Sequence, residues 1–423
     1  MTTTTSEFDL DTVPFPAPLR LPTVAERSLP NGLRLICARR SSVPLVEACL
    51  SIPFGDTEPG ASMVLASALV SAPTLQDRLR AMGAALSTGV DADRLRIAGS
   101  TLAEHLADFL ALLAEVAIVA EFPADEIAIA VSKGVRYSEI IRSEPSHRVL
   151  EAWNRRMFGD HPYGQAGPSA EAIARVDRDT VLDLQTRRMR PNDASLVLVG
   201  DLDPDATLDL VNRWFTGWSP GSDAVAMPPV PPWVPGDEVV DLPGSTQSLL
   251  RLAMPAPRHA EPEAPALAMA CMVFGGYFSS RLVQNIREDR GLSYSPRSGV
   301  LHVAEASLIT IAVDAVTANT TAVATEVLAE LARMVTCPVT PDELDRARRY
   351  TAGSLRLQLS TLTGTAAVLL ELDQNGLTLD WLRDQDDRLA AVTPDQVTEA
   401  AGRHMTASNA VSVLLCDKDK VFT

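Results

Sequence analysis

The sequence predicts an α+β protein of two homologous domains, each a mainly antiparallel sheet with helices packed on one face. Three observations lead to this prediction. The 423 residues are enough for two domains. The hydrophobic fraction of 46% is enough to form buried cores. One order of strand-like and helix-like segments occurs twice along the chain, which indicates a duplicated unit.

A proline-rich segment between the two copies predicts where the domains meet. Repeated proline removes backbone donors and stiffens the chain, so residues 219–236 are expected to be a linker. We therefore place an N-terminal domain at 23–218 and a C-terminal domain at 237–423. Residues 1–22 are rich in threonine and proline and predict a flexible arm.

The repeated elements follow one another in the same order in both halves. A first apolar strand leads into a helix, a strand with period-two alternation leads into an amphipathic helix, and an apolar strand closes each half. A proline followed by acidic residues marks a further helix start in each half, at Pro123 and Pro341. In order, the first half has segments 46–52, 62–71, 94–99, 105–119 and 194–201, and the second half has 247–254, 264–274, 306–313, 320–335 and 409–417.

Charge and cysteine content limit the function classes. The net charge of −17 argues against a nucleic-acid-binding surface, which would be basic. The five cysteines form no metal-binding spacing and are scattered, as expected for thiols in a reducing compartment. We find neither 18 consecutive apolar residues nor a signal-peptide pattern, so we expect a cytoplasmic protein without a membrane partner.

Four motifs carry a resemblance to a known family. They are Leu-Pro-Asn-Gly-Leu-Arg at 29–34, His-Pro-Tyr-Gly at 161–164, Gly-Gly-Tyr-Phe-Ser-Ser-Arg-Leu at 275–282, and Ile-Arg-Glu-Asp-Arg-Gly-Leu-Ser-Tyr-Ser at 286–295. With them the chain resembles the insulinase/pitrilysin-type zinc peptidases, specifically the short two-domain members related to mitochondrial processing peptidase. The resemblance extends over nearly the whole chain from about Leu29.

The resemblance implies that a zinc site has been lost from the first domain. Family enzymes carry His-x-x-Glu-His on a helix, where two histidines bind zinc and the glutamate activates the bound water. In this chain Met63 and Ser67 fall at the histidines and Ala66 at the glutamate, while Glu139 matches the third ligand. We therefore expect no metal, no cofactor and no catalytic residue acting in isolation.

The second domain, by contrast, keeps a family pair. The resemblance implies that Arg287 and Tyr294, seven positions apart, hold the substrate carbonyl and stabilise an oxyanion. It also implies a heterodimer in which a zinc-binding peptidase subunit of the same family supplies the metal and this chain helps to bind and process peptides. A structural ion pair for Arg287 and strand packing for Tyr294 is the alternative for these two residues.

Two other functions stay open at this point. The chain could be a binding or scaffold protein of peptidase fold without a proteolytic role. It could also be an independent hydrolase, but we find no Gly-x-Ser-x-Gly elbow and no convincing Cys/His pair. His302 begins a segment that starts like the zinc motif but ends in alanine, and His161 is expected to be structural because His-Pro-Tyr-Gly is typical of a turn.

Overall fold

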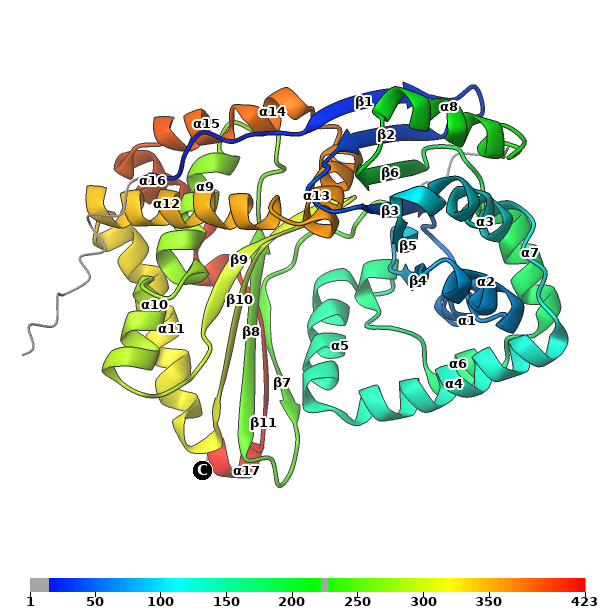
Figure 1. Cartoon of the computed structure of the whole chain (residues 1–423). Helices are drawn as coiled ribbons and strands as arrows, with labels where there is room; N and C mark the ends of the chain where they lie inside the picture. The colour runs from blue at the N-terminus through cyan, green and yellow to red at the C-terminus, as the bar shows by residue number, and fades with distance from the viewer. Residues whose placement is uncertain (1–14, 222–226, 423) are drawn as a thin grey trace, which may run out of the picture.

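A computed structural model describes residues 15–221 and 227–422 of the chain. Figure 1 shows two sheets, each accompanied by helices, and confirms the predicted α+β class with two domains of like architecture. The predicted arm at 1–22 and linker at 219–236 lie partly outside the described residues. The domain boundaries stay a prediction.

The first sheet has six strands in the order β1-β2-β6-β3-β5-β4. Only β2 and β6 run parallel to each other, and the remaining neighbours are antiparallel. The strands are β1 Thr23–Ser28, β2 Arg34–Arg39, β3 Leu45–Pro53, β4 Ala85–Val90, β5 Arg94–Leu102 and β6 Ser195–Gly200. The helices are α1 Pro59–Leu69, α2 Pro73–Ala81, α3 Leu106–Ile118, α4 Ala124–Ser143, α5 Pro145–Phe158, α6 Ala170–Ala174, α7 Arg178–Arg188 and α8 Pro204–Phe215.

The second sheet repeats this pattern, with no equivalent of β1 among the residues that the structure describes. Its order is β7-β11-β8-β10-β9, again with one parallel pair, β7 and β11. The strands are β7 Gly236–Asp241, β8 Gln247–Pro255, β9 Arg297–Val303, β10 Ala306–Val316 and β11 Val411–Cys416. The helices are α9 Ala264–Cys271, α10 Arg281–Val283, α11 Thr320–Thr336, α12 Pro341–Gln358, α13 Leu362–Gln374, α14 Leu379–Arg383, α15 Gln385–Ala391, α16 Pro394–His404 and α17 Lys418–Val421.

Local chemistry accounts for the helix starts that the sequence predicts. At α12 the Thr340 hydroxyl accepts a hydrogen bond from the backbone N–H of Glu343, whose carboxylate accepts from the Thr340 backbone N–H. Pro341 occupies the first turn, where a missing N–H costs nothing. This reciprocal pair satisfies two donors that the helix itself leaves free, so α12 starts where the sequence predicts.

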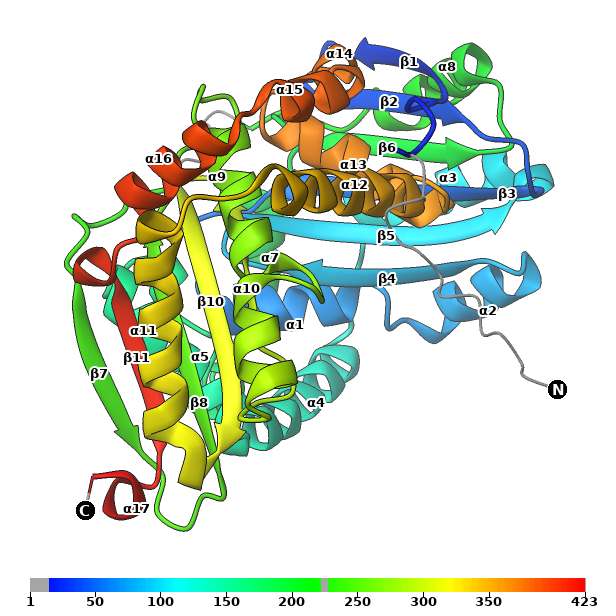
Figure 2. The same cartoon turned by 90° about the vertical axis from the view of Figure 1, so that its left-hand side faces the viewer.

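Each sheet is covered on its second face by a helix from the other domain. In the first sheet, Ile36 and Val197 pack against Leu369 and Leu370 of α13. In the second sheet, Leu249, Ala253 and Val413 pack against α5, which contributes Val149, Ala152, Trp153 and Met157. Figure 2 shows α10 and α11 in front of the second sheet and α5 behind it. The domains have in effect exchanged one helix each, so both sheets are buried on both faces.

One helical stretch is long and apolar enough to cross a membrane by length and composition. It runs from Ala264 to Asp289 through α9, a π-helical turn at Met272–Gly276 (η4), α10 and a second π-helical turn at Gln284–Asp289 (η5). Within its most apolar window, 61% is buried inside the protein. Core helices of folded domains pass the same test, and this stretch contributes Leu267, Met269 and Phe274 to the core of the second domain.

Candidate functional site

Helix α1 carries the three positions that the resemblance aligns with a zinc motif. Its start is fixed by Glu58, whose carboxylate accepts hydrogen bonds from the backbone N–H groups of Gly60 and Ala61. Ala66 is buried, and Met63 and Ser67 are half-buried on the same helix. A thioether, a methyl and a hydroxyl do not form the imidazole and carboxylate set that zinc prefers. Within residues 15–221 and 227–422 no three His, Cys, Asp or Glu side chains are grouped to hold a metal, so these residues do not fit zinc.

Met63 lines a cavity of about 530 Å³ between α1, α4 and α5, here called the first cavity. Its apolar wall includes Met63, Val90, Ile141 and Leu150, and its carboxylates are Asp56, Asp91 and Asp160. No lysine or arginine is among its lining residues. Asp56 has a φ of 53°, a left-handed conformation that is uncommon for a residue other than glycine. The first domain therefore has a cavity beside α1, with three carboxylates in its lining.

The structure does not place Glu139 among the lining residues of this cavity, and its match to the third ligand stays a prediction. Glu139 is on the exposed side of α4 and is not a lining residue. The neighbours Tyr137 and Ser138 line the cavity instead, and the buried Ser138 hydroxyl donates to the carbonyl of Pro168 at 2.9 Å. On a helix each position turns by about 100°, so an offset of one or two residues redirects a side chain. The burial of Gly134 and Ser138, four residues apart, marks the inward face of α4.

Arg287 and Tyr294 do lie together, on the surface of the second domain. The guanidinium carbon of Arg287 is 4.5 Å from the ring centroid of Tyr294 and 4.8 Å from that of Phe278. Tyr294 is 78% exposed and Phe278 is 56% exposed. Arg287 Nε lies 3.1 Å from a carboxylate oxygen of Glu288. We call Phe278, Arg287 and Tyr294 the aromatic clamp. Sequence reasoning missed Phe278, although it stands inside the glycine-rich motif.

The aromatic clamp is remote from Met63 in the same chain. Figure 1 shows α10, next to the clamp in sequence, on one side of the second sheet and α1 on the other, with α5 between them. Helix α1 and the segment that carries the aromatic clamp therefore do not meet within one copy of the chain.

Another residue of the glycine-rich motif has a structural role. Arg281 holds Glu343 through two parallel hydrogen bonds, from Nε at 2.7 Å and from Nη2 at 2.9 Å. It also donates to the carbonyls of Cys337 and Pro338, and so joins α10 to the start of α12. Burial raises the pKa of Glu343, but the hydrogen bonds from Arg281 and Thr340 and the charge of Arg281 outweigh it and lower the pKa to about 2.

The structure places the two histidines considered in the sequence analysis, His161 and His302, in different environments. His161 is structural, as expected: its Nδ1 accepts from the Tyr163 backbone N–H and its Nε2 lies 2.9 Å from the Pro228 carbonyl. His302 lies within β9 and stacks on His259 with ring centroids 3.5 Å apart. Burial, followed by the charge of His259, lowers the pKa of His302 to about 4. This imidazole pair is the only stacked pair of histidines in the part of the chain that the structure describes.

Comparisons with known proteins agree with this architecture. The family model "Peptidase M16 inactive domain" matches residues 175–350. An uncharacterized zinc protease of Mycobacterium bovis is 25% identical over 306 residues, which cover 67% of this chain and 68% of that protein. A solved M16 inactive domain from Pseudomonas fluorescens has a TM-score of 0.86 at 21% identity and covers 93% of this chain and 98% of its own. A protease from Helicobacter pylori has a TM-score of 0.85 at 16% identity, with 94% and 100% covered.

The match, the relatives and the shared fold point to one family. The matched segment begins in the first domain and extends through the aromatic clamp and α11. These findings agree with the resemblance seen in the sequence: residues 175–350 match the inactive domain of peptidase family M16, and the chain is similar to proteins named as zinc proteases and to solved M16 structures.

Proposed function

We propose that the chain is a non-catalytic, substrate-binding subunit of a two-chain zinc peptidase that processes or degrades peptides. A second subunit of the same family would supply zinc, and this chain would supply Arg287 and Tyr294 to that metal site. The proposal extends the coarser statement that the chain has a peptidase fold with an M16 inactive domain.

The observation that carries the proposal is the geometry of the aromatic clamp. Ring faces lie close to the Arg287 guanidinium. Among residues 15–221 and 227–422, the guanidinium's one partner apart from the rings is Glu288, at Nε. A guanidinium stacked on rings keeps its in-plane N–H groups available, because the cation–π contact uses its face. The Tyr294 hydroxyl adds a further donor on a highly exposed side chain. Such donors suit a peptide carbonyl and the oxyanion that develops during hydrolysis.

The separation of the clamp from α1 supports a second chain as the partner. Met63, Ala66 and Ser67 provide no zinc ligand, and the second sheet lies between α1 and α10. Donors positioned for hydrolysis on such a chain are useful only next to a metal held elsewhere. A subunit with an intact zinc motif meets that requirement.

The test is reconstitution. The chain would be purified alone and mixed with a zinc-binding peptidase of the same family, and cleavage of a fluorogenic peptide library would be measured. We expect cleavage by the mixture that exceeds the sum of the separate chains. We further expect Arg287→Ala or Tyr294→Phe to lower kcat of the mixture by about 10²–10³-fold, the usual cost of losing one oxyanion donor.

Two nearby residues offer matched controls. Arg290→Ala removes an arginine from the same segment that pairs with Glu326, and Tyr350→Phe removes a hydroxyl from a tyrosine that stacks on Tyr277. Both variants should retain the activity of the mixture. If Arg287→Ala and Arg290→Ala behave alike, the clamp has no special role and the chain is better described as a scaffold of peptidase fold.

A further inference from the structure

The second domain has a cavity in the place that corresponds to the first cavity. The first cavity lies between the loop after β3, α1, the end of β4, α4 and α5. The loop after β8, α9, β9, α12 and α13 occupy the same positions in the repeated order and enclose adjoining spaces of about 290 and 320 Å³. A further space of about 520 Å³ opens beside them towards α15 and α16. We call these three spaces, which share His259 and Trp381, the second cavity.

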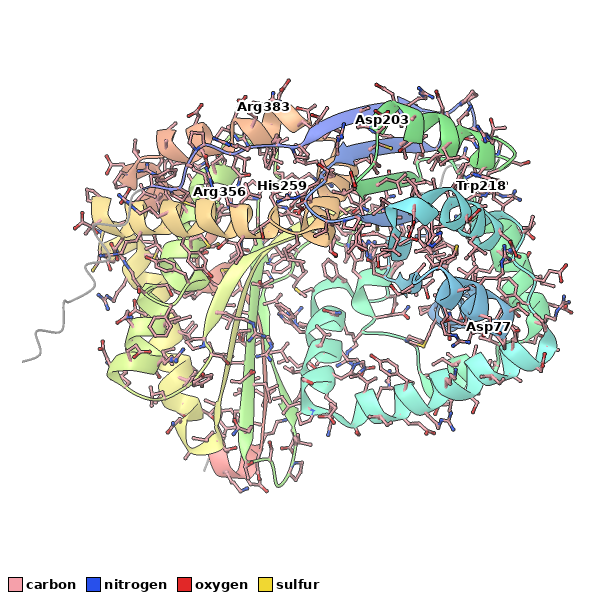
Figure 3. The ribbon with its side chains drawn as sticks, in the orientation of Figure 1. Asp77, Asp203, Trp218, His259, Arg356 and Arg383 are labelled. Atoms are coloured by element: carbon pink, nitrogen blue, oxygen red, sulfur yellow. The ribbon has the colours of Figure 1, made fainter. Side chains whose placement is uncertain are left out.

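The second cavity differs from the first in the chemistry of its walls. Most of its lining is apolar and includes Leu267, Met272, Val300 and Leu372. The polar groups His259, Trp381, Arg388 and Glu371 each line at least two of the three spaces. Further charged groups, Glu261, Glu263, Glu399 and Arg403, line the outer space. Figure 3 shows His259 near the centre of the molecule, close to the junction of α12 and α13. Apolar walls with a few convergent polar groups are typical of small-molecule sites.

Two nitrogen atoms at this junction are buried without a hydrogen-bond partner among the residues that the structure describes. They are Nη2 of Arg388 and Nε2 of His259. Both side chains are positioned by the same indole. The Arg388 guanidinium carbon lies 4.1 Å from the Trp381 ring centroid, and the His259 ring meets Trp381 edge to face at 5.9 Å. A buried polar group left unpaired costs about 1–3 kcal/mol, and more when it is charged. An acceptor placed between these groups would remove that cost.

We propose that the second cavity binds an apolar molecule that carries a carboxylate, which is held by Arg388 and His259. A carboxylate is the acceptor that matches a guanidinium edge, and the apolar lining accommodates the rest of the molecule. The same chemistry is found in a medium-chain fatty acid and in the free C-terminus of an apolar peptide. This site is independent of the aromatic clamp and of any zinc-binding partner.

Carboxylates also line the second cavity, with Glu261, Glu263 and Glu399 in the outer space and Glu371 beside His259, and Glu371 gives the test its sign. Glu371 Oε1 lies 3.8 Å from His259 Nε2. A bound anion would meet the like charge of Glu371, so neutralising that residue should strengthen binding. A cationic ligand would respond in the opposite way, because Glu371 would then be its partner.

Calorimetry on the full chain would test the proposal with two acid–amide pairs. The probes are decanoate with decanamide, and N-acetyl-trileucine with its C-terminal amide. We expect one of the acids to bind and its amide to bind at least about tenfold more weakly, because hydrogen bonds to charged groups contribute roughly 1.5–3 kcal/mol. The acid that binds identifies the source as a fatty acid or as a peptide C-terminus.

Substitutions in the cavity lining test whether the acid binds in the second cavity. Arg388→Gln should weaken the acid about tenfold and leave the amide unchanged, and Glu371→Gln should strengthen the acid. Arg383→Gln is the matched control, because Arg383 is on the neighbouring helix α14, pairs with Asp380 and does not line the cavity. Equal binding of acid and amide, unchanged binding after Arg388→Gln, or no binding of either acid at millimolar concentration would each overturn the proposal. Thermal unfolding of every variant confirms that the fold is retained.

Discussion

The two cavities occupy corresponding places in a duplicated fold but have different chemistry. The first, under α1, has three aspartates and no lysine or arginine in its lining. The second, under α9, has stacked imidazoles, an indole and an unpaired guanidinium nitrogen. The repeated order of strands and helices fixes where a cavity forms, whereas individual side chains decide what it can hold. Duplication has preserved the position and allowed the chemistry to diverge.

The largest loss of stability is expected from substitutions in the two exchanged helices, α5 and α13. Trp153→Ala on α5 and Leu370→Ala on α13 should each lower the free energy of unfolding by about 3–5 kcal/mol, because each empties a space against the opposite domain's sheet. Urea denaturation followed by circular dichroism measures this. Leu357→Ala, at a residue that is 74% exposed, should change stability by less than about 0.5 kcal/mol. Two separate unfolding transitions in the wild type would show that the halves do not depend on each other.

Substitution within the glycine-rich motif of the second domain should lower the free energy of unfolding by nearly as much. Arg281→Ala leaves Glu343 without its bidentate partner and should cost about 3 kcal/mol. Because the pKa of Glu343 is lowered from 4.5 to about 2 in the fold, its contribution is present above pH 4.5 and is lost as the pH falls towards 2. Glu343→Gln should flatten the stability profile in that window. An unchanged profile would mean that the ion pair does not stabilise the fold.

Rebuilding a metal site would test which face of α4 looks into the first cavity. Met63→His, Ala66→Glu and Ser67→His restore the motif on α1, and the third ligand is then added as Tyr137→Glu. We expect the quadruple variant to bind zinc more tightly than the triple variant, by more than the roughly 10–100-fold that an outer-sphere partner contributes. The triple variant retains the native Glu139, so it serves as the comparison. Equal zinc affinities by competition with a chelator would contradict the placement of position 137 at the third ligand.

The smallest effect is expected at the imidazole pair of the second cavity. The folded pKa of His302 is lowered from 6.5 to about 4, so the unfolded chain binds the additional proton first. The free energy of unfolding should therefore fall as the pH is lowered from about 6.5 to about 4. His302→Gln should reduce this slope, while His105→Gln, at a half-buried histidine before α3, should not. A wild type and His302→Gln with parallel profiles would contradict the lowered pKa.

The sequence predicts the repeated elements well because each carries its own signal. The closing strand expected at 194–201 is β6, Ser195–Gly200, and the helix expected at 320–335 is α11, Thr320–Thr336. The helix exchange was not predictable in this way, because the apolar stripe on α5 shows that Trp153 is buried but not against which sheet. The orientation of Glu139 was not predictable for a related reason: carboxylates on a helix look alike in a sequence until the rotation of the helix is known.

The helix exchange also means that part of the first domain stays uncovered while the rest of the chain is being synthesised. β6 ends at Gly200, yet the helix that covers the second face of its sheet spans Leu362–Gln374. At about 5–20 residues per second, a growing chain displays the apolar face around Ile36 and Val197 for roughly 10–35 s before its cover is made. During that interval the nascent first domain exposes an apolar surface that can bind other proteins non-specifically. Slow translation or truncation before residue 374 should therefore increase its demand for chaperones and its loss to aggregation.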